Sequence, residues 1–261
     1  MQHKMKTYVI SLSGSARRDE CRRLLDGIGM EFEFFDAYNG RERAIEDDFF
    51  SRYDEIANAT KFKRPLSPEE IGCYLSHIDV WEKVAISGAA ALVLEDDFAI
   101  EHDAKSFLDS IPSYLIKNSI IKVCSAKRQR WSGSPVYVFN GRRIRQYRTV
   151  GPHTTGYVID PAAAAKLLKK RDRFSRPVDI DLKYLWEHGV TIYGVTPALV
   201  GQRGARENST IDSGRKEMKP KSSVRRFFAN MMYQVRFRNS ELLYRYFSRE
   251  QYYGDDRRSK G

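Results

Sequence analysis

The sequence of 261 residues has only three cysteines, Cys21, Cys73 and Cys124, and no C-x-x-C pair. This usage excludes a disulfide framework and a cysteine-type zinc site, and it is typical of a reducing compartment. Residues 1–14 contain no apolar run of the secretory type, and no window approaches the roughly 20 apolar residues of a membrane span. We therefore expect a cytoplasmic protein that is soluble or peripheral to the membrane.

Sequence patterns for nucleic-acid recognition are also missing. The chain has no RNP, helix-turn-helix or zinc-finger pattern, which argues against a nucleic-acid-binding module. Its acids and histidines form no two-metal pattern, which argues against a metal-dependent nuclease or phosphoesterase. Both classes stay as alternatives because the net charge of +11 favours an anionic partner. With 41% apolar and 12% aromatic residues, the chain has enough apolar side chains to bury a core.

Strand and helix patterns alternate along the first hundred residues. Tyr8–Leu12 is predicted as a buried strand, Arg17–Leu25 as a helix and Glu31–Phe35 as a second strand. Ser67 then begins a helix with Pro68 and Glu70 in a capping box, and Gly88 ends it before a strand at Ala91–Leu94. This alternation predicts a parallel α/β unit.

The second half of the chain continues the α/β pattern. Strands are predicted at Ile120–Cys124, Val136–Phe139, Arg145–Val150, Gly156–Ile159 and Val190–Val195. Helices are predicted at Pro161–Lys170 and Asp181–His188. We therefore expect one α/β domain over residues 1–213.

Residues 214–261 form a basic tail with 13 Lys and Arg but 5 Asp and Glu. The polar stretch 201–223 is predicted to be mobile. Residues 222–238 mix Phe and Met with arginines, which predicts an amphipathic helix. Such a helix would bind an anionic membrane surface, or it would pack on the core with a basic outer face.

The segment Ala90–Ile100 (AALVLEDDFAI) places Glu95, Asp96 and Asp97 directly after an apolar strand. In open α/β sheets, ligands bind beyond the carboxyl ends of strands. Carboxylates suit Mg²⁺ or Mn²⁺, whose remaining ligands are usually substrate phosphates and water. Alternation along an extended segment would put Glu95 and Asp97 on one face. The alternative is a solvated strand end or the N-cap of a following helix.

Four segments carry a family resemblance, and they occur in the order Tyr8–Leu12 with Arg17-Arg18, Asp36–Gly40 (DAYNG), Glu70–His77 (EIGCYLSH) and Leu94–Asp97 (LEDD). Together they resemble glycosyltransferase family 25, the bacterial lipooligosaccharide galactosyltransferase family, to which collagen galactosyltransferase domains are related. The resemblance runs from about Lys6 to Phe98 and continues more weakly to Ser209. The helix string followed closely by LEDD is its most specific part.

The resemblance implies a GT-A fold, a Rossmann-like single domain with a mixed, mostly parallel sheet. It implies an inverting, metal-dependent transferase that moves a sugar, most often galactose from UDP-galactose, to a glycolipid or oligosaccharide acceptor in lipopolysaccharide biosynthesis. The acidic string would hold Mn²⁺ or Mg²⁺, with Asp97 as the main ligand and Glu95 assisting, while Asp96 contacts the donor. Gln202 stands at a late metal or phosphate contact, although histidine or aspartate would be the stronger ligand.

The resemblance also predicts the donor site. The loop after the first strand would meet the nucleotide, so Arg17 or Arg18 would bind phosphate or ribose unless each is a solvated helix start. In the DAYNG turn, Ala37 and Gly40 would let uracil approach, unless the segment is simply a tight turn. The predicted donor-binding residues are Ser11, Leu12, Arg17, Arg18, Ala37, Tyr38, Asn39, Gly40, Ser76, His77, Glu95 and Asp96. For His77, the alternative is a structural role.

An inverting transferase needs a base that deprotonates the acceptor hydroxyl. The segment Pro177–Asp181 (PVDID) offers Asp179 and Asp181, and the family's Pro-x-Asp pattern matches Asp179. The alternative for Asp179 is a helix N-cap, with Asp181 in the first turn. His153 and Thr155 are predicted on the acceptor side.

Overall fold

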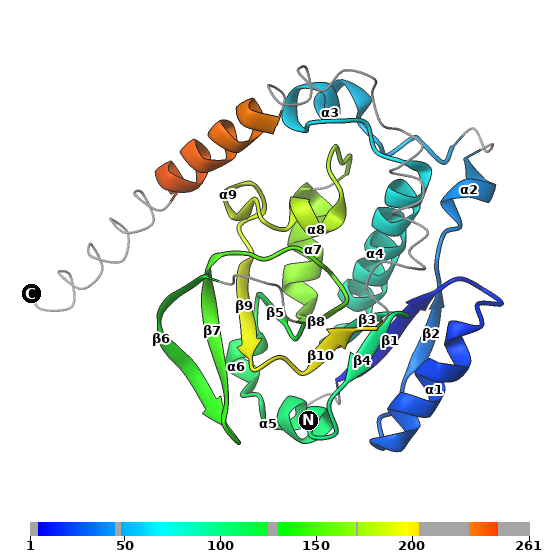
Figure 1. The fold of residues 1–261 in the computed structure, drawn as a ribbon, viewed down its shortest axis with the longest axis vertical. Coiled ribbons are helices and arrows are strands. Elements are labelled where there is room, and N and C mark those ends of the chain that lie inside the picture. The colour runs from blue at the N-terminus through cyan, green and yellow to red at the C-terminus, as the bar shows by residue number, and fades with distance from the viewer. Residues whose placement is uncertain (1–4, 45–47, 125–129, 171, 204–229, 245–261) are drawn as a thin grey trace, which may run out of the picture.

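The computed structural model describes residues 5–44, 48–124, 130–170, 172–203 and 230–244. Its centre is an eight-stranded sheet in the order β2-β1-β3-β8-β5-β9-β7-β6 (Figure 1). The strands are β1 (Lys6–Ser11), β2 (Glu33–Asp36), β3 (Ala91–Glu95), β5 (Ser119–Lys122), β6 (Arg130–Phe139), β7 (Arg142–Thr149), β8 (Gly156–Ile159) and β9 (Thr191–Thr196). A second, two-stranded sheet pairs β4 (Phe98–Ile100) with β10 (Val200–Gln202).

Strand directions make the sheet mixed and mostly parallel. β1 pairs in parallel with β2 and β3, and β5 pairs in parallel with β9, whereas β8 and β7 run against their neighbours. The register sets Ile10 opposite Glu95, so β1 and β3 end at the same edge of the sheet. The predicted fold class is confirmed, and the acidic segment lies at the edge where α/β proteins bind ligands.

Helices cover both faces of the sheet (Figure 1). Alternate residues of β1 separate two buried clusters, because Tyr8 and Ile10 face the cluster of α4 and α7, while Val9 faces that of α1, α5 and α6. The helices are α1 (Arg17–Gly27), α2 (Gly40–Arg43), α3 (Glu55–Lys61), α4 (Pro68–Ser87), α5 (Ala104–Ser110), α6 (Ser113–Ile116), α7 (Pro161–Lys170), α8 (Val178–Asp181) and α9 (Leu185–His188).

The predicted capping box of α4 is confirmed. The Ser67 hydroxyl accepts the Glu70 backbone N–H at 3.3 Å, and the Glu70 carboxylate accepts the Ser67 N–H at 3.1 Å. Gly88 ends the helix with φ +64°. These caps fix where α4 starts and stops, and thus fix the side chains that it presents to β3 and β8.

The predicted helix Asp181–His188 is wrong as a single element. The structure has two short helices there, α8 and α9, with Leu182 to Tyr184 between them. The predicted strands at Val136 and Arg145 begin earlier, because β6 starts at Arg130 and β7 at Arg142. Most of β6 is exposed, so it lacks the alternation of buried and exposed positions that marks a strand.

Residues 230–244 form a helix that packs on the domain (Figure 1). Its inner side sets Tyr233 against Phe62 and Phe237 against Trp186, with ring centroids 5.6 and 5.4 Å apart. Met231, Val235 and Leu242 share the opposite side and are exposed. Predictions for residues 204–229 lie outside the described residues, and no described helix is long and apolar enough to span a membrane.

Candidate functional site

Three acids lie at the end of β3, with Glu95 as its last residue and Asp96 and Asp97 directly after it, and each side chain has a different set of partners. Asp96 faces the loop after β1, where its carboxylate accepts the Ser11 hydroxyl at 2.8 Å and an Arg17 guanidinium N–H at 3.0 Å. Arg203 holds the segment after β3, since its guanidinium donates to the Asp96 carbonyl at 3.0 Å. Asp96 therefore organises the residues at the ends of β1 and β3.

Asp97 has the features of a cation ligand. Its Oδ2 accepts an N–H of the Gln202 amide at 2.7 Å, whereas its Oδ1 is buried and has no hydrogen-bond partner among the described residues. Burial raises the pKa of Asp97 to about 6, and the charge of Glu95 adds to this effect. A buried carboxylate oxygen without a donor and close to a second carboxylate fits a divalent cation.

Glu95 is held by a chain of buried hydrogen bonds. Its Oε1 lies 2.5 Å from the Thr154 hydroxyl and 3.3 Å from His77 Nε2. The Tyr157 hydroxyl lies 2.8 Å from His77 Nδ1 and accepts the Trp81 N–H at 2.9 Å. Because Tyr157 accepts from Trp81, its own O–H is available for Nδ1, which leaves the proton of a neutral imidazole on Nε2, facing Glu95.

These contacts set the charge and orientation of Glu95. Burial raises the pKa of Glu95, but the hydrogen bonds from His77 and Thr154 outweigh it, so the pKa lies below its ordinary value. His77 is 0% exposed, so it contacts Glu95 from the protein interior and cannot reach a ligand at the surface. The structure therefore supports the structural alternative for His77, in which it positions Glu95.

Cys73, His77 and Glu95 offer ligand atoms within 4.8 Å of one another. Both ring nitrogens of His77 are already within hydrogen-bond distance of Tyr157 and Glu95. A metal at this triad would have to displace one of them. The side chain of Asp97 has an oxygen to spare, so the ligand side of the acidic segment is the better cation site.

The two arginines of the predicted donor loop have different roles. Arg17 is bonded to Asp96 but keeps a 40% exposed side chain, so it can reach a ligand at the edge of the sheet. Arg18 donates to the Ser11 carbonyl at 2.8 Å and pairs with Asp36, and its guanidinium lies over the Phe34 ring. Leu12 closes the turn that precedes the two arginines, since its carbonyl accepts the Ser15 N–H at 3.1 Å.

The DAYNG turn packs on α4, which explains its glycine. A Cβ on Gly40 would lie 2.0 Å from the Pro68 carbonyl oxygen, so the missing side chain accommodates α4 and not uracil. Ser76 is buried and accepts the Tyr38 backbone N–H at 2.9 Å. The predicted approach of uracil at Gly40 is therefore wrong, while Ala37 and Asn39 are partly exposed and remain predictions.

Asp179 lies beside the loop that carries His153. The His153 backbone N–H, at a residue with φ +73°, donates to Asp179 Oδ2 at 3.4 Å. The His153 side chain is exposed, and its loop reaches the acidic site because the next residue, Thr154, places its hydroxyl 2.5 Å from Glu95 Oε1. Thr155 is buried and contributes its backbone, because its carbonyl accepts the Glu95 N–H at 3.0 Å.

Asp181 does not face a ligand site. It is 3% exposed, and its carboxylate accepts the Tyr74 hydroxyl at 2.6 Å and the Arg176 Nε–H at 2.9 Å. Arg176 also pairs with Glu187, so the three charges form a buried network. The structure gives Asp181 a structural role, which contradicts its prediction as a catalytic residue.

Sequence reasoning missed Lys122, Thr154 and Arg203. Lys122 is buried in β5 and donates to the carbonyls of Gly151 and Pro152 at 2.7 and 3.0 Å, which holds the loop that carries His153. Burial lowers the pKa of Lys122. A lysine inside the apolar run Ile120–Cys124 was the available signal, because a buried amine needs a specific partner.

The fold is that of an α/β protein whose candidate ligand site lies at the carboxyl ends of β1 and β3, with clustered acids beside it. The chain belongs to glycosyltransferase family 25. The sequence profile of that family, described as "Glycosyltransferase family 25 (LPS biosynthesis protein)", matches residues 4–182.

Curated relatives agree with this assignment. A "Glycosyltransferase 25 family member" of Aedes aegypti is 38% identical over 63% of this chain and 28% of its own length. The "Lacto-N-neotetraose biosynthesis glycosyltransferase LgtE" of Neisseria gonorrhoeae is 26% identical over 76% of this chain and 74% of its own. The human "Procollagen galactosyltransferase 2" is 32% identical over 58% of this chain and 25% of its own.

The chain spans less than a third of the first insect relatives that it matches, at 28%, 17% and 29% of their lengths. Among solved structures, a galactosyltransferase LgtC complex with donor and acceptor sugar analogues covers 84% of this chain at 10% identity, with a TM-score of 0.43. At that TM-score, the likeness supports no statement about the site.

Proposed function

We propose that this chain transfers a sugar from a UDP-sugar, with UDP-galactose as the first candidate, to a saccharide acceptor of lipooligosaccharide or lipopolysaccharide. Family membership and the names of the relatives support the reaction class, and the human relative's name supports galactose. A bovine relative is named "Probable inactive glycosyltransferase 25 family member 3", so membership alone does not establish activity. The proposal therefore depends on the acidic site.

The unpartnered Oδ1 of Asp97 carries the proposal. Asp97 and Glu95 would hold Mn²⁺ or Mg²⁺, and Gln202 would assist after its amide rotates to present its oxygen. When bound, the cation neutralises negative charge on the diphosphate leaving group. The chain's own part is to hold Glu95 ionised through His77 and Thr154 and to keep the Asp97 oxygen available.

Donor binding is proposed at the ends of β1 and β3. The exposed Arg17 guanidinium lies beside Asp96 and would add a charge-assisted hydrogen bond to a phosphate or ribose oxygen. Asp96 accepts hydrogen bonds from both Ser11 and Arg17 and so orients this arginine. These bonds hold the loop after β1 against the acidic segment after β3.

Asp179 is the proposed base. Its carboxylate would take the proton of an acceptor hydroxyl while that oxygen forms the new bond to the anomeric carbon. The bond between that carbon and the diphosphate breaks, and UDP leaves with the electron pair, so the configuration inverts. The partial exposure of Asp179 and its contact with the loop of His153 favour this role over Asp181.

A peripheral membrane position is proposed through the outer side of the helix 230–244. Met231, Val235 and Leu242 are 43%, 48% and 62% exposed on that side. The tail from residue 214 carries eight more basic than acidic residues. Apolar side chains and basic charge together favour an anionic lipid surface, which would bring a lipid-linked acceptor close.

UDP release tests the proposed reaction. The full-length chain would be assayed with a panel of UDP-sugars and saccharide acceptors ending in glucose or N-acetylglucosamine, with Mn²⁺ and with EDTA. We expect turnover with at least one donor that depends on both Mn²⁺ and acceptor. Absence of metal-dependent turnover with every donor would contradict the proposal.

A further inference from the structure

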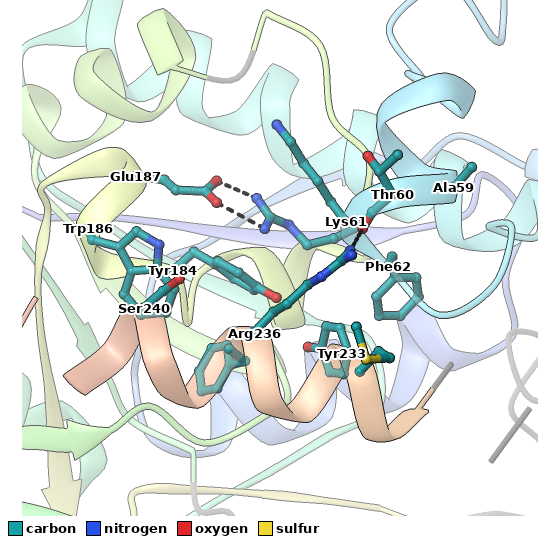
Figure 2. Close-up of a pocket in the computed structure, with 13 residues that line it drawn as sticks. Ala59, Thr60, Lys61, Phe62, Tyr184, Trp186, Glu187, Tyr233, Arg236 and Ser240 are labelled. Atoms are coloured by element: carbon teal, nitrogen blue, oxygen red, sulfur yellow. Dashed lines mark hydrogen bonds and ion pairs between the residues drawn. The ribbon is translucent and has the colours of Figure 1, made fainter. Parts of the chain in front are cut away.

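A cavity of about 460 Å³ lies where the end of α3, the segment around α9 and the helix 230–244 meet (Figure 2). Its volume is within the range of roughly 300–1,000 Å³ that is usual for small-molecule sites. The helix supplies Tyr233, Arg236 and Ser240 as one wall. The helix 230–244 of the basic tail therefore packs on the domain and also lines a cavity large enough for a small molecule.

Aromatic side chains form much of the lining. Trp186, Tyr184 and Phe237 lie with ring centroids 5.0 to 5.4 Å apart, and Phe62 and Tyr233 close another part of the wall. Trp186 is partly exposed, so part of its indole is available to a ligand. The C–H faces of a sugar ring are apolar and its hydroxyls point outward, so a saccharide suits aromatic walls that carry a few polar groups.

Polar groups in the cavity come from an ion pair at its wall. Arg176 is buried and binds the Glu187 carboxylate through both terminal nitrogens. Each carboxylate oxygen has a further lone pair, and the Glu187 side chain is 28% exposed. Glu187 can therefore accept hydrogen bonds from sugar hydroxyls without giving up Arg176.

Two further cations line the cavity without a carboxylate partner among the described residues. Lys61 is exposed, and Arg236 donates to the backbone carbonyl of Thr60 at 2.7 Å, which leaves its charge uncompensated. Glu187 is the only acid in the described lining, and Arg176 already pairs with it. The cavity therefore favours a ligand with a negative charge.

The cavity lies close to the proposed base. Residues 176–187 form one continuous segment that carries Asp179 in α8 and then Tyr184, Trp186 and Glu187 on the cavity wall. The Tyr184 backbone N–H donates to the Asp181 carbonyl at 3.0 Å, which joins the end of α8 to the cavity wall. A saccharide whose reacting hydroxyl lies at Asp179 can thus extend towards the cavity.

We propose that this cavity is an acceptor subsite that binds a sugar unit bearing a phosphate or a carboxylate. The sugar ring lies on Trp186, its hydroxyls donate to Glu187, and its anionic group binds Lys61 and Arg236. The identification of this sugar as part of the acceptor rests on the proposed function. The binding of an acidic sugar can nevertheless be measured without transfer.

Isothermal titration of the full-length chain in EDTA tests the subsite with glucose 6-phosphate, glucuronate, glucose and inorganic phosphate. We expect at least one acidic sugar to bind at least tenfold more tightly than glucose and than phosphate, and the two acidic sugars distinguish phosphate from carboxylate. Lys61→Gln should remove this preference. Trp186→Ala should abolish binding, while Trp186→Phe, which retains an aromatic face, should preserve most of it.

Two controls separate this inference from the proposed function. Lys166→Gln removes an exposed charge from α7 outside the cavity and should change nothing. Asp97→Asn should leave the binding of the acidic sugar intact, because it alters the donor side alone. Equal affinity for acidic and neutral sugars, or tight binding that persists in Lys61→Gln, overturns the subsite. Sugar binding without any UDP release overturns only the proposed function.

Discussion

Asp179 and Asp181 lie in the same turn of α8, but their surroundings suit them to different roles. Asp181 is buried against Arg176 and Tyr74, while Asp179, two residues earlier, is partly exposed beside the loop of His153. A buried carboxylate that pairs with a buried guanidinium compensates a charge that would otherwise be costly. A partly exposed carboxylate with one weak contact is available to a substrate.

Asparagine substitutions at these positions should therefore have opposite effects. Asp181→Asn should lower the free energy of unfolding by about 3 kcal/mol, because Glu187 is then the one carboxylate left beside Arg176 in the described part of the chain. Asp179→Asn should change it by less than about 0.5 kcal/mol, as for other surface changes, and should abolish transfer. Urea denaturation and UDP release measure the two effects. A stable but inactive Asp181→Asn would restore Asp181 as a catalytic candidate.

The hydrogen bonds behind Glu95 allow a second test at the residue scale. Tyr157→Phe removes the hydroxyl that links Trp81 and His77, and it leaves two buried polar groups without that partner. We expect a loss of about 1–3 kcal/mol in unfolding free energy, which corresponds to about 2–4 °C in Tm for each kcal/mol. Tyr114→Phe, at a residue that is 69% exposed, is the control and should leave Tm unchanged.

The residue pattern pointed to the acidic residues, and the family resemblance alone gave them different roles. Glu95, Asp96 and Asp97 were predicted as a ligand site from their place after an apolar strand, and the structure gives each a different set of partners. The structural roles of His77 and Asp181 could not be derived from the sequence, because their partners, Tyr157 and Tyr74, are 80 and 107 residues away in the chain. A contact between residues so far apart in the chain produces no local sequence pattern from which it could be predicted.

At the scale of elements, α4 and the turn before α2 meet through two glycines. A Cβ on Gly40 would lie 2.0 Å from the Pro68 carbonyl oxygen, and a Cβ on Gly72 would lie 2.8 Å from the Tyr38 carbonyl oxygen. The turn and the helix can approach this closely only without side chains. The contact places Tyr38 against α4, since its N–H binds Ser76.

Gly40→Ala should lower the free energy of unfolding by about 1–3 kcal/mol, because the added methyl group overpacks a backbone contact. Gly27→Ala is the matched control, since a Cβ there meets no atom within 4 Å at the end of α1. It should leave stability unchanged or raise it by up to about 1 kcal/mol. Thermal denaturation of both variants checks the pair, and equal effects would contradict the packing account.

Elements with local signals were predicted well, and those defined by pairing were not. The α4 helix has a capping box, a proline start and a glycine end, all visible in the sequence. β4 and β10 have three residues each and exist because they pair across about 100 residues, so they were missed. That small sheet brings Gln202 to Asp97, where the proposed cation site has its third ligand.

At the scale of the whole molecule, the net charge of +11 is distributed unevenly. The surplus of basic residues from position 214 accounts for most of it, and the helix 230–244 places apolar residues on its outer side. The tail was predicted either to bind a membrane or to pack on the core. The inner side packs on the domain, while the outer side is available for a surface.

Vesicle flotation tests this surface. The full-length chain should float with vesicles that contain phosphatidylglycerol and stay in solution with neutral phosphatidylcholine vesicles, because each basic residue near an anionic surface contributes about 1 kcal/mol. High salt should release it. Val235→Ser with Leu242→Ser should weaken flotation without changing Tm, since both side chains are exposed. Equal recovery with both vesicle types, or no flotation, would contradict the membrane proposal.

The central claim is that Asp97 binds a divalent cation together with the diphosphate of the donor, and Mn²⁺ binding tests it without knowledge of the donor sugar. Water-proton relaxation of Mn²⁺ would be titrated with the full-length chain in the presence of UDP, for the wild type and for Asp97→Asn. We predict one UDP-dependent Mn²⁺ site in the wild type and its loss in Asp97→Asn, with at least about a 100-fold fall in transfer and an unchanged Tm. Equal Mn²⁺ binding by both proteins would contradict the claim.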